Sequence, residues 1–323
     1  MLQIYCDGPY VLASVALLGI GGWLVVIRQL TLGQLVAAEL IVSVSMASIV
    51  KLGKSLEDFD DLMASVHKLG VLIDLPLERT TGAVALPVEA PAALNLKGVG
   101  YTYAGARTPV IENLNLQLSP GDRAALLGPS SAGKSTITDL IYGLREPQHG
   151  HVELDGIDLR DIRLDDLRRH VAAVTSELEV FAASVLDNIR LDRPWVSTMD
   201  VRAALAAVDM LEPVLALPNG LLTQLTTGGS PLSRGQAVRL ALARAIAGRP
   251  RLLILDEVLD GFPPYIRERI LPTFLDRKAP WTLLLITVEF GMAQSCDRQL
   301  QFSELMVAKP VPDGPGENGI TST

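Results

Sequence analysis

The chain has 323 residues, a formal net charge of −8 and a hydrophobic fraction of 49%. This length predicts about two domains. The acidic balance, without a basic stripe, argues against a nucleic-acid-binding surface and thus against a nucleic-acid partner. Cys6 and Cys296 lie far apart and in no ligand spacing, so the sequence indicates neither a disulfide framework nor a cysteine-bound metal.

Two long apolar runs lie near the N-terminus. Residues 10–27 carry no charged side chain, and residues 32–50 carry one acid. Because about 20 apolar residues span a bilayer, we predict transmembrane helices at about 10–27 and 32–50, joined by a short connector at 28–31. A signal peptide is the alternative for the first run, but it requires Lys or Arg ahead of the apolar core. Residues 1–9 have neither and contain Asp7 instead.

The acid in the second run is Glu39. A charge at mid-bilayer is costly and usually faces a transport pathway or a partner, which is one interpretation of Glu39. The other is a position near the interface, or a protonated carboxyl. Lys51 and Lys54 follow this run and favour an exit on the cytoplasmic side. The sequence therefore predicts a membrane protein in contact with lipid.

Residues 52–75 continue from the second run with apolar residues at helical spacing. Charged residues lie between them, and His67 among these is a surface residue by this pattern. We expect the partial membrane region, residues 1–75, to end in a long cytosolic amphipathic helix that Pro76 terminates. Residues 76–92 then read as a linker. The apolar positions are Leu52, Leu56, Phe59, Leu62, Met63, Val66, Leu69, Leu72 and Ile73.

The second predicted domain covers residues 93–308, where strand and helix patterns alternate. Residues 252–255 and 282–286 are continuous apolar runs, as expected of central parallel strands that are buried on both faces. Repeated βα units predict a layered α/β domain. The tail at 309–323 is rich in Pro, Gly, Ser and Thr, which predicts disorder.

A complete phosphate-binding loop, G-x-x-x-x-G-K-[ST], follows the apolar strand at 123–127 and precedes a predicted helix. Its small residues let successive backbone N–H groups face a phosphate. Lys134 reaches the β and γ phosphates, and Ser135 places its hydroxyl on Mg²⁺. The alternative, a Gly/Ser turn with a chance lysine, leaves the matching flanks unexplained. The predicted nucleotide-binding residues are Gly128, Ser130, Ser131, Ala132, Gly133, Lys134, Ser135 and Thr136.

Two further motifs accompany this loop. The apolar strand at 252–255 ends in Asp256 and Glu257. Asp256 is expected to hold Mg²⁺, and Glu257 to polarise the attacking water. Upstream, Ser233 is a natural N-cap for a helix that runs to residue 247. The start of that helix offers free N–H groups to a phosphate, but not to one held by the loop of the same chain.

In this order the three motifs resemble those of an ATP-binding cassette (ABC) transporter of the exporter type, with a membrane region fused ahead of the cassette. The resemblance covers the chain except its tail. It implies ATP and Mg²⁺ as cofactors, and two cassettes that sandwich two ATP molecules head to tail. Ser233, Gly235 and Gln236 then contact the ATP of the partner cassette. The resemblance also places Tyr103 against adenine; an ordinary strand aromatic is the alternative.

Four departures from the family pattern accompany the resemblance. Ser176 stands where the family has a glutamine, and Val288 where it has a histidine. Residues 260–263 replace the Ser-Ala-Leu-Asp segment, and Arg234 replaces a glycine. Losing one donor to the reacting phosphate costs roughly 10²–10³ in rate. We therefore predict firm ATP binding with slow hydrolysis, and a heterodimer with a more conventional cassette in preference to a homodimer.

The family carries six membrane helices ahead of the cassette, whereas this sequence has room for two. Either another polypeptide supplies the rest, or the start codon is misplaced, or the sequence is a fragment.

The leading functional hypothesis is an ATP-hydrolysing component of an ABC exporter, located in the inner or plasma membrane with its cassette in the cytoplasm. Glu257 and Lys134 are its predicted catalytic residues. The alternative is an ATP-binding but hydrolysis-deficient regulatory half of a heterodimeric transporter. A DNA-repair or translation ATPase conflicts with the apolar runs and with the lack of a coiled-coil insertion. A small-molecule kinase is the least favoured hypothesis, because its reaction does not require the helix that begins after Ser233.

Overall fold

The computed structural model describes residues 2–75, 78–79, 82, 84–86, 90–129 and 132–306; the side chains of residues 2–13, 46, 49, 50, 53 and 57 are not described. The chain divides into two compact units, Met1–Glu78 and Arg79–Thr323. The tail at 309–323, predicted to be disordered, lies outside the described residues.

The first unit is a pair of helices, α1 (Leu2–Val26) and α2 (Leu32–Ile73). Thr31 caps α2: its hydroxyl accepts from the Gln34 backbone N–H, and the Gln34 side chain accepts from the Thr31 N–H. The two helices approach closely at Gly21, where an added Cβ would lie 2.3 Å from Cδ1 of Leu35. The predicted helices and their connector are therefore present.

Among the residues that the structure describes, no helix is long and apolar enough to cross a membrane. The prediction of two membrane-spanning helices, at 10–27 and 32–50, is therefore not confirmed, although both segments are helical. Glu39 on α2 is half-buried, and His67 is exposed as predicted. The apolar residues predicted for the amphipathic part of α2 are exposed: Leu52, Leu56, Phe59, Leu62, Met63, Val66, Leu69, Leu72 and Ile73.

The second unit contains an antiparallel sheet of four described strands in the order β2-β1-β4-β5. Its strands are β1 (Leu94–Tyr101), β2 (Ile111–Leu118), β4 (His149–Leu154) and β5 (Ile157–Asp158). In β2, Leu114, Leu116 and Leu118 alternate with more exposed residues, as the sequence predicts for a sheet with one buried face. Arg79 and Val84, in the predicted linker, belong to this unit: Arg79 donates to the Arg160 carbonyl, and Val84 forms a bridge with Ile162.

A parallel sheet of five described strands forms the centre of the second unit, in the order β6-β7-β8-β3-β9. Every residue of β3, β7 and β8 is buried. This confirms the prediction that the continuous apolar runs are central parallel strands. The strands are β3 (Arg123–Leu127), β6 (Val171–Val174), β7 (Leu252–Asp256), β8 (Thr282–Thr287) and β9 (Arg298–Gln301).

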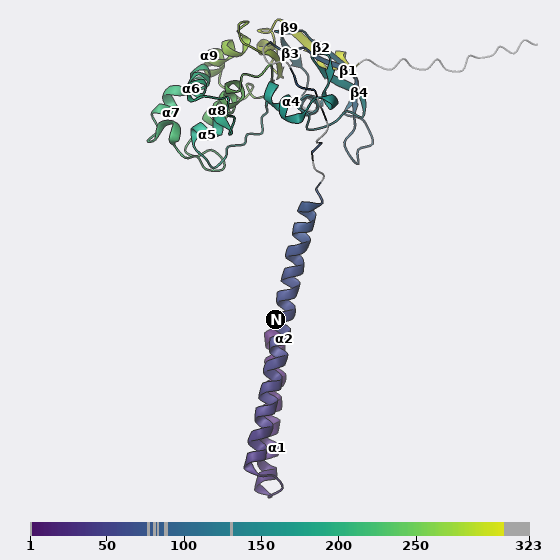
Figure 1. Ribbon diagram of the computed structural model, residues 1–323, viewed down its shortest axis with the longest axis vertical. Helices are drawn as coiled ribbons and strands as arrows, with labels where there is room; N and C mark the ends of the chain where they lie inside the picture. The colour runs from purple at the N-terminus through teal and green to yellow at the C-terminus, as the bar shows by residue number, and fades with distance from the viewer. Residues whose placement is uncertain are drawn as a thin grey trace, which may run out of the picture. The chain divides into compact units, whose positions relative to one another are not determined.

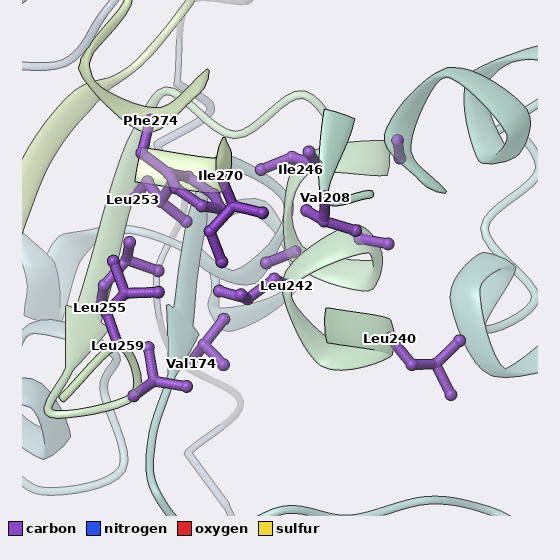
Figure 2. Packing of buried hydrophobic residues seen from close by; sticks show 14 of the residues in the cluster. Val174, Val208, Leu240, Leu242, Ile246, Leu253, Leu255, Leu259, Ile270 and Phe274 are labelled. Carbon is purple, nitrogen blue, oxygen red and sulfur yellow. The ribbon is translucent and has the colours of Figure 1, made fainter. Parts of the chain in front are cut away.

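Alternate residues of these strands enter two separate cores. Leu253 and Leu255 of β7 pack into one apolar cluster with Ile270 and Phe274, as Figure 2 shows. Leu252 and Ile254 point to the opposite face, into a cluster shared with the antiparallel sheet and α3. The central sheet is thus one layer of a layered α/β domain, because the period of two sends successive side chains to opposite faces.

Helices of the second unit pack around these sheets, and in Figure 1 α5 to α8 gather at one end of the unit while β1, β2 and β4 lie at the other. The 3-10 turns are η1 (Leu159–Asp161) and η2 (Gly220–Leu222). The α-helices are α3 (Lys134–Ile141), α4 (Leu164–His170), α5 (Val185–Arg190), α6 (Thr198–Ala207), α7 (Leu211–Leu215), α8 (Arg234–Ala247), α9 (Pro264–Leu275), α10 (Phe290–Ala293) and α11 (Phe302–Leu305).

Candidate functional site

The candidate site lies where four parallel strands end at one edge of the central sheet. Leu127 at the end of β3 is paired with Thr287 at the end of β8, and Asp256 at the end of β7 is paired with Ile286. Val174 at the end of β6 is paired with Leu255. In open α/β sheets, ligands bind at such carboxyl ends. The sheet therefore gathers the phosphate loop, the acidic pair, Ser176 and Val288 at one edge.

Glycines allow the phosphate loop to pack tightly between β3 and α3. Gly133 adopts φ +95 as the N-cap of α3, and an added Cβ would lie 2.6 Å from Cγ1 of Val110. At Gly128 an added Cβ would lie 2.9 Å from Cβ of Phe302. Both positions therefore exclude larger residues. Ser130 and Ser131, predicted to bind nucleotide, lie outside the described residues.

Lys134 is the central cation of the site, and its side chain is 1% exposed. Its Nζ donates to the carbonyl oxygens of Gly128 and Pro129, each at 2.7 Å. The same Nζ lies 2.8 Å from Oε1 of Glu257. The ammonium thus joins the phosphate loop to the acidic end of β7, the two motifs that the sequence predicted to act together.

Asp256 is a buried carboxylate with one free oxygen. Its Oδ2 accepts from the Thr138 hydroxyl at 3.3 Å, while Oδ1 has no hydrogen-bond partner among the described residues. Burial raises the pKa of Asp256 above its usual range, and the neighbouring charge of Glu257 raises it further. The Ser135 hydroxyl, Thr138 and Lys134 act in the opposite direction by stabilising the charged form.

These groups fit Mg²⁺. The cation prefers hard oxygen ligands, and it is commonly held by one or two protein oxygens together with substrate phosphates. The free Oδ1 of Asp256 and the nearby Ser135 hydroxyl supply such oxygens. No cluster of three or more His, Cys, Asp or Glu able to hold a metal occurs in the described part of the chain. An Mg²⁺ site here depends on phosphate oxygens for its remaining ligands.

Glu257 occupies an unusual backbone conformation. Its φ is +53, in the left-handed region that a non-glycine residue seldom adopts. Its backbone N–H donates to the Ile286 carbonyl at 2.9 Å, which ties the residue to the neighbouring strand β8. The side chain of Glu257 is 28% exposed, whereas residue Asp256 is 2% exposed. Glu257 is therefore held at the sheet edge with its side chain partly accessible to water, as a general base requires.

Tyr103 is half-buried beyond the end of β1, and its hydroxyl lies 3.0 Å from Oγ1 of Thr136. Thr136 belongs to the first turn of α3, directly after the phosphate loop. This hydrogen bond brings the predicted base-stacking residue to the phosphate loop, although the two are far apart in the sequence.

The segment after β8 is held by Asp260, whose role the sequence interpretation missed. The Thr287 hydroxyl donates to Oδ1 of Asp260 at 2.6 Å, and the Val288 N–H donates to Oδ2 at 3.1 Å. The Glu289 N–H donates to the Thr287 hydroxyl at 2.9 Å. Residue Val288 is 49% exposed. An acid four residues beyond the β7 end was the available signal, because β7 and β8 pair side by side.

Helix α8, the helix that the sequence predicts after Ser233, begins at the same cavity as Glu257. Ser233 caps α8, and its hydroxyl accepts from the Gln236 N–H while the Gln236 side chain accepts from the Ser233 N–H. This confirms the predicted N-cap. Gly235 and Arg234, at the start of α8, line a largely apolar cavity of about 400 Å³ together with Ser176 and Glu257. The structure therefore places Ser176 and Arg234, two residues that differ from the family pattern, at the same cavity as Glu257.

Residues 111–260 match the family model described as ABC transporter. The chain is 36% identical over 196 residues to the ATP-dependent lipid A-core flippase of Thiobacillus denitrificans, covering 60% of this chain and 34% of that protein. It is 31% identical over 290 residues to the cyclolysin secretion/processing ATP-binding protein CyaB of Bordetella pertussis, covering 89% of this chain and 40% of that protein.

Among solved structures, a bacterial Atm1-family ABC exporter with ATP bound matches with a TM-score of 0.67 and 25% identity. The match covers 84% of this chain and 48% of that one. The chain therefore spans less than half the length of these relatives. Residues 111–260 form an ABC transporter domain within an ABC cassette α/β fold, and the chain is homologous to ABC exporter proteins.

Proposed function

We propose that this chain is the ATP-binding component of an ABC exporter, and that it binds MgATP at the edge of the central sheet. The observation that carries the proposal is the contact between Lys134 and Glu257, at 2.8 Å, beside Asp256, whose Oδ1 has no hydrogen-bond partner in the described part of the chain. One cation for phosphates, one carboxylate for Mg²⁺ and one for water are thus within a single cluster. Phosphoryl transfer needs little beyond such positioning and charge stabilisation.

In this proposal each residue has a defined task. Lys134 moves from its carbonyl partners toward the β and γ phosphates, and Ser135 and Asp256 hold Mg²⁺. Bound Mg²⁺ neutralises charge that develops on the phosphate oxygens. The release of Lys134 leaves the Glu257 carboxylate able to accept a proton from the attacking water. Tyr103 stacks on adenine. Ser233, Gly235 and Gln236 contact the ATP of a partner cassette.

A second candidate function is ATP binding with little or no hydrolysis by this chain's own site. Val288 offers no polar side chain, and Thr287 is already bonded to Asp260 and to the Glu289 N–H. The end of β8 therefore supplies no free side-chain donor for the reacting phosphate. In this case a partner cassette performs the hydrolysis, which favours a heterodimer.

We further propose a location at the inner or plasma membrane, with the cassette on the cytoplasmic side. The exporter relatives support this location, as do the apolar runs at 10–27 and 32–50. The chain spans 34–40% of the length of these curated relatives, and we propose that transmembrane helices supplied from outside this sequence act with it. The relatives named for lipid A-core and cyclolysin support export as the class of function, and they do not choose a substrate.

The test measures MgATP binding and steady-state hydrolysis by the purified full chain. Binding that Lys134→Ala removes, with phosphate release that Glu257→Gln removes, is expected for the leading function. Binding without phosphate release above the Glu257→Gln level supports the second candidate. A chain that binds no MgATP contradicts both.

A further inference from the structure

Tyr103 belongs to a connected group of side chains that the proposed function uses only in part. We call this group the tyrosine–arginine cluster. It joins the end of β1 to α3 and to the turn that follows α3. Its members are Tyr101, Tyr103, Thr136, Asp139 and Arg145.

Arg145 is the cation of this cluster, and two partners hold it in place. Its Nε donates to Oδ2 of Asp139 at 2.8 Å, and its Nη1 donates to the Tyr101 hydroxyl at 3.2 Å. The Asp139 bond, and then the Tyr101 bond, raise the pKa of Arg145 above its already high ordinary value. Arg145 is therefore a permanently charged planar group with restricted freedom, although its side chain is 38% exposed.

The guanidinium lies over the ring of Tyr103. Its Cζ is 4.7 Å from the centre of the Tyr103 ring and 5.8 Å from that of Tyr101. The two ring centres are 5.2 Å apart, with ring planes at 89°. Because these three separations are similar, the three groups lie at the corners of a nearly equilateral triangle. Arg145 and Tyr101 therefore do not approach the Tyr103 ring from opposite directions. Neither of them covers the face of the Tyr103 ring that is turned away from Arg145.

The hydroxyl of Tyr103 fixes the ring from a third direction. It is bonded to Thr136, which is 3% exposed and lies in the first turn of α3. The ring is thus held by a cation over one face, by an edge contact with Tyr101 and by a hydrogen bond at its tip. An aromatic ring held this way loses little further freedom when a flat ligand stacks on it, and such preorganisation increases affinity.

We propose that Arg145 is a positioning residue for the nucleotide base. It fixes the plane of the Tyr103 ring from one face, so that a purine stacks on the opposite face. The proposal rests on the proposed function, because it takes Tyr103 as the base-stacking residue. The competing explanation is that Arg145 only anchors the turn after α3 to Tyr101 and Asp139. The two explanations differ for a ligand that has phosphates but no base.

The experiment measures dissociation constants of the purified full chain for MgATP and for magnesium tripolyphosphate, by calorimetry. Arg145→Met is expected to weaken MgATP binding about threefold to tenfold, the range of a partly exposed cation–π contact, and to leave tripolyphosphate binding unchanged. Arg145→Lys is expected to lose less, because it keeps the charge but not the planar group. Arg202→Met, at an exposed position on α6, is the matched control and should change neither constant.

Two further variants guard against misfolding of Arg145→Met. Asp139→Asn keeps Arg145 but loosens it, and should weaken MgATP binding in the same direction by a smaller factor. In a Tyr103→Leu background, Arg145→Met should produce no further change in the ratio of the two constants, because the ring that it positions is gone.

Equal losses for MgATP and tripolyphosphate would overturn the proposal, since they indicate a general structural role. An unchanged MgATP constant in Arg145→Met would overturn it as well. Both results leave the proposed function standing. A wild-type chain that binds neither ligand instead overturns the proposed function, and this inference with it.

Discussion

The ends of β7 and β8 lie side by side at the same edge of the central sheet, but they offer different chemistry. Strand β7 ends in Asp256, whose Oδ1 has no hydrogen-bond partner among the described residues, and the next residue, Glu257, contacts Lys134. Strand β8 ends in Thr287, and Val288 follows it; the Thr287 hydroxyl and the Val288 backbone N–H both donate to Asp260. The sheet places the carboxyl ends of β7 and β8 at the same edge, and the residue types at each end determine its chemistry. From this difference we predict that the residues at the end of β7 contribute strongly to MgATP binding. The residues at the end of β8 are predicted to contribute little to ATP hydrolysis.

The largest effect is expected for Glu257→Gln, which tests whether the carboxylate that follows β7 acts in hydrolysis. It keeps the shape of the side chain and removes its basicity, so ATP hydrolysis should fall about 10²- to 10³-fold, within the range of a general base. MgATP binding should persist. Phosphate release under single-turnover conditions measures the change. Glu268→Gln, at an exposed position on α9, is the control and should retain the wild-type rate. Equal rates in wild type and Glu257→Gln would mean that β7 supports binding alone.

Lys134→Ala tests the binding side of the same strand end. Loss of a charged donor to the phosphates should weaken MgATP binding about 30- to 100-fold. Equilibrium dialysis measures the dissociation constant. The matched control is Lys97→Ala, which removes another ion-paired lysine, 2.8 Å from Glu153 but 49% exposed. Comparable losses in both variants would contradict a specific role for Lys134.

Val288→His adds a hydrogen-bonding side chain directly after β8, where the wild type has an apolar one. If β8 limits turnover, hydrolysis should rise about tenfold, part of the roughly 10²–10³ assigned to one donor at a reacting phosphate. Val288→Leu is the control, because it changes size without adding a donor. An unchanged rate in Val288→His means that the limit lies elsewhere in the site, such as at Ser176.

Asp260→Asn weakens the two hydrogen bonds that hold Thr287 and Val288 at the end of β8. The amide nitrogen cannot accept one of the two hydrogen bonds, and the amide oxygen accepts the other without a charge, which should lower the free energy of unfolding by about 1 kcal/mol. For a unit of this size that corresponds to a fall in Tm of about 2–4 °C. Thermal unfolding by circular dichroism measures it. Asp297→Asn removes an exposed ion pair with Arg277 and should shift the Tm less.

The smallest expected effect is a pH dependence that belongs to Asp256. Burial raises its pKa above the ordinary value of 3.8, so the folded chain binds this proton more tightly than the unfolded chain. The contribution of Asp256 to stability therefore falls as pH rises from 3.8 through the raised pKa. Relative to Asp256→Asn, the wild type should become more stable as pH is lowered through that window. Parallel denaturation curves at several pH values test the sign; the opposite slope contradicts it.

Local sequence patterns determined much of this protein. The strand before the phosphate loop and the helix after it, the continuous apolar runs of β7 and β8 and the N-cap at Ser233 were each predicted correctly, because they depend on neighbouring residues. The helical hairpin was also predictable from its apolar runs and the connector at 28–31. Whether those helices span a membrane was not settled by that pattern, and no described helix meets the length and apolarity required.

Only the tertiary structure decided which distant residues meet. Strand order places β8 between β7 and β3, and this pairing brings Asp260 to Val288 and Glu257 to Lys134. The fold likewise brings Arg145 over the ring of Tyr103, from a turn that lies 42 positions further along the chain. Such contacts depend on sheet order and on close packing between layers. A single sequence carries no periodic signal for them, because side chains that touch across strands share no local spacing.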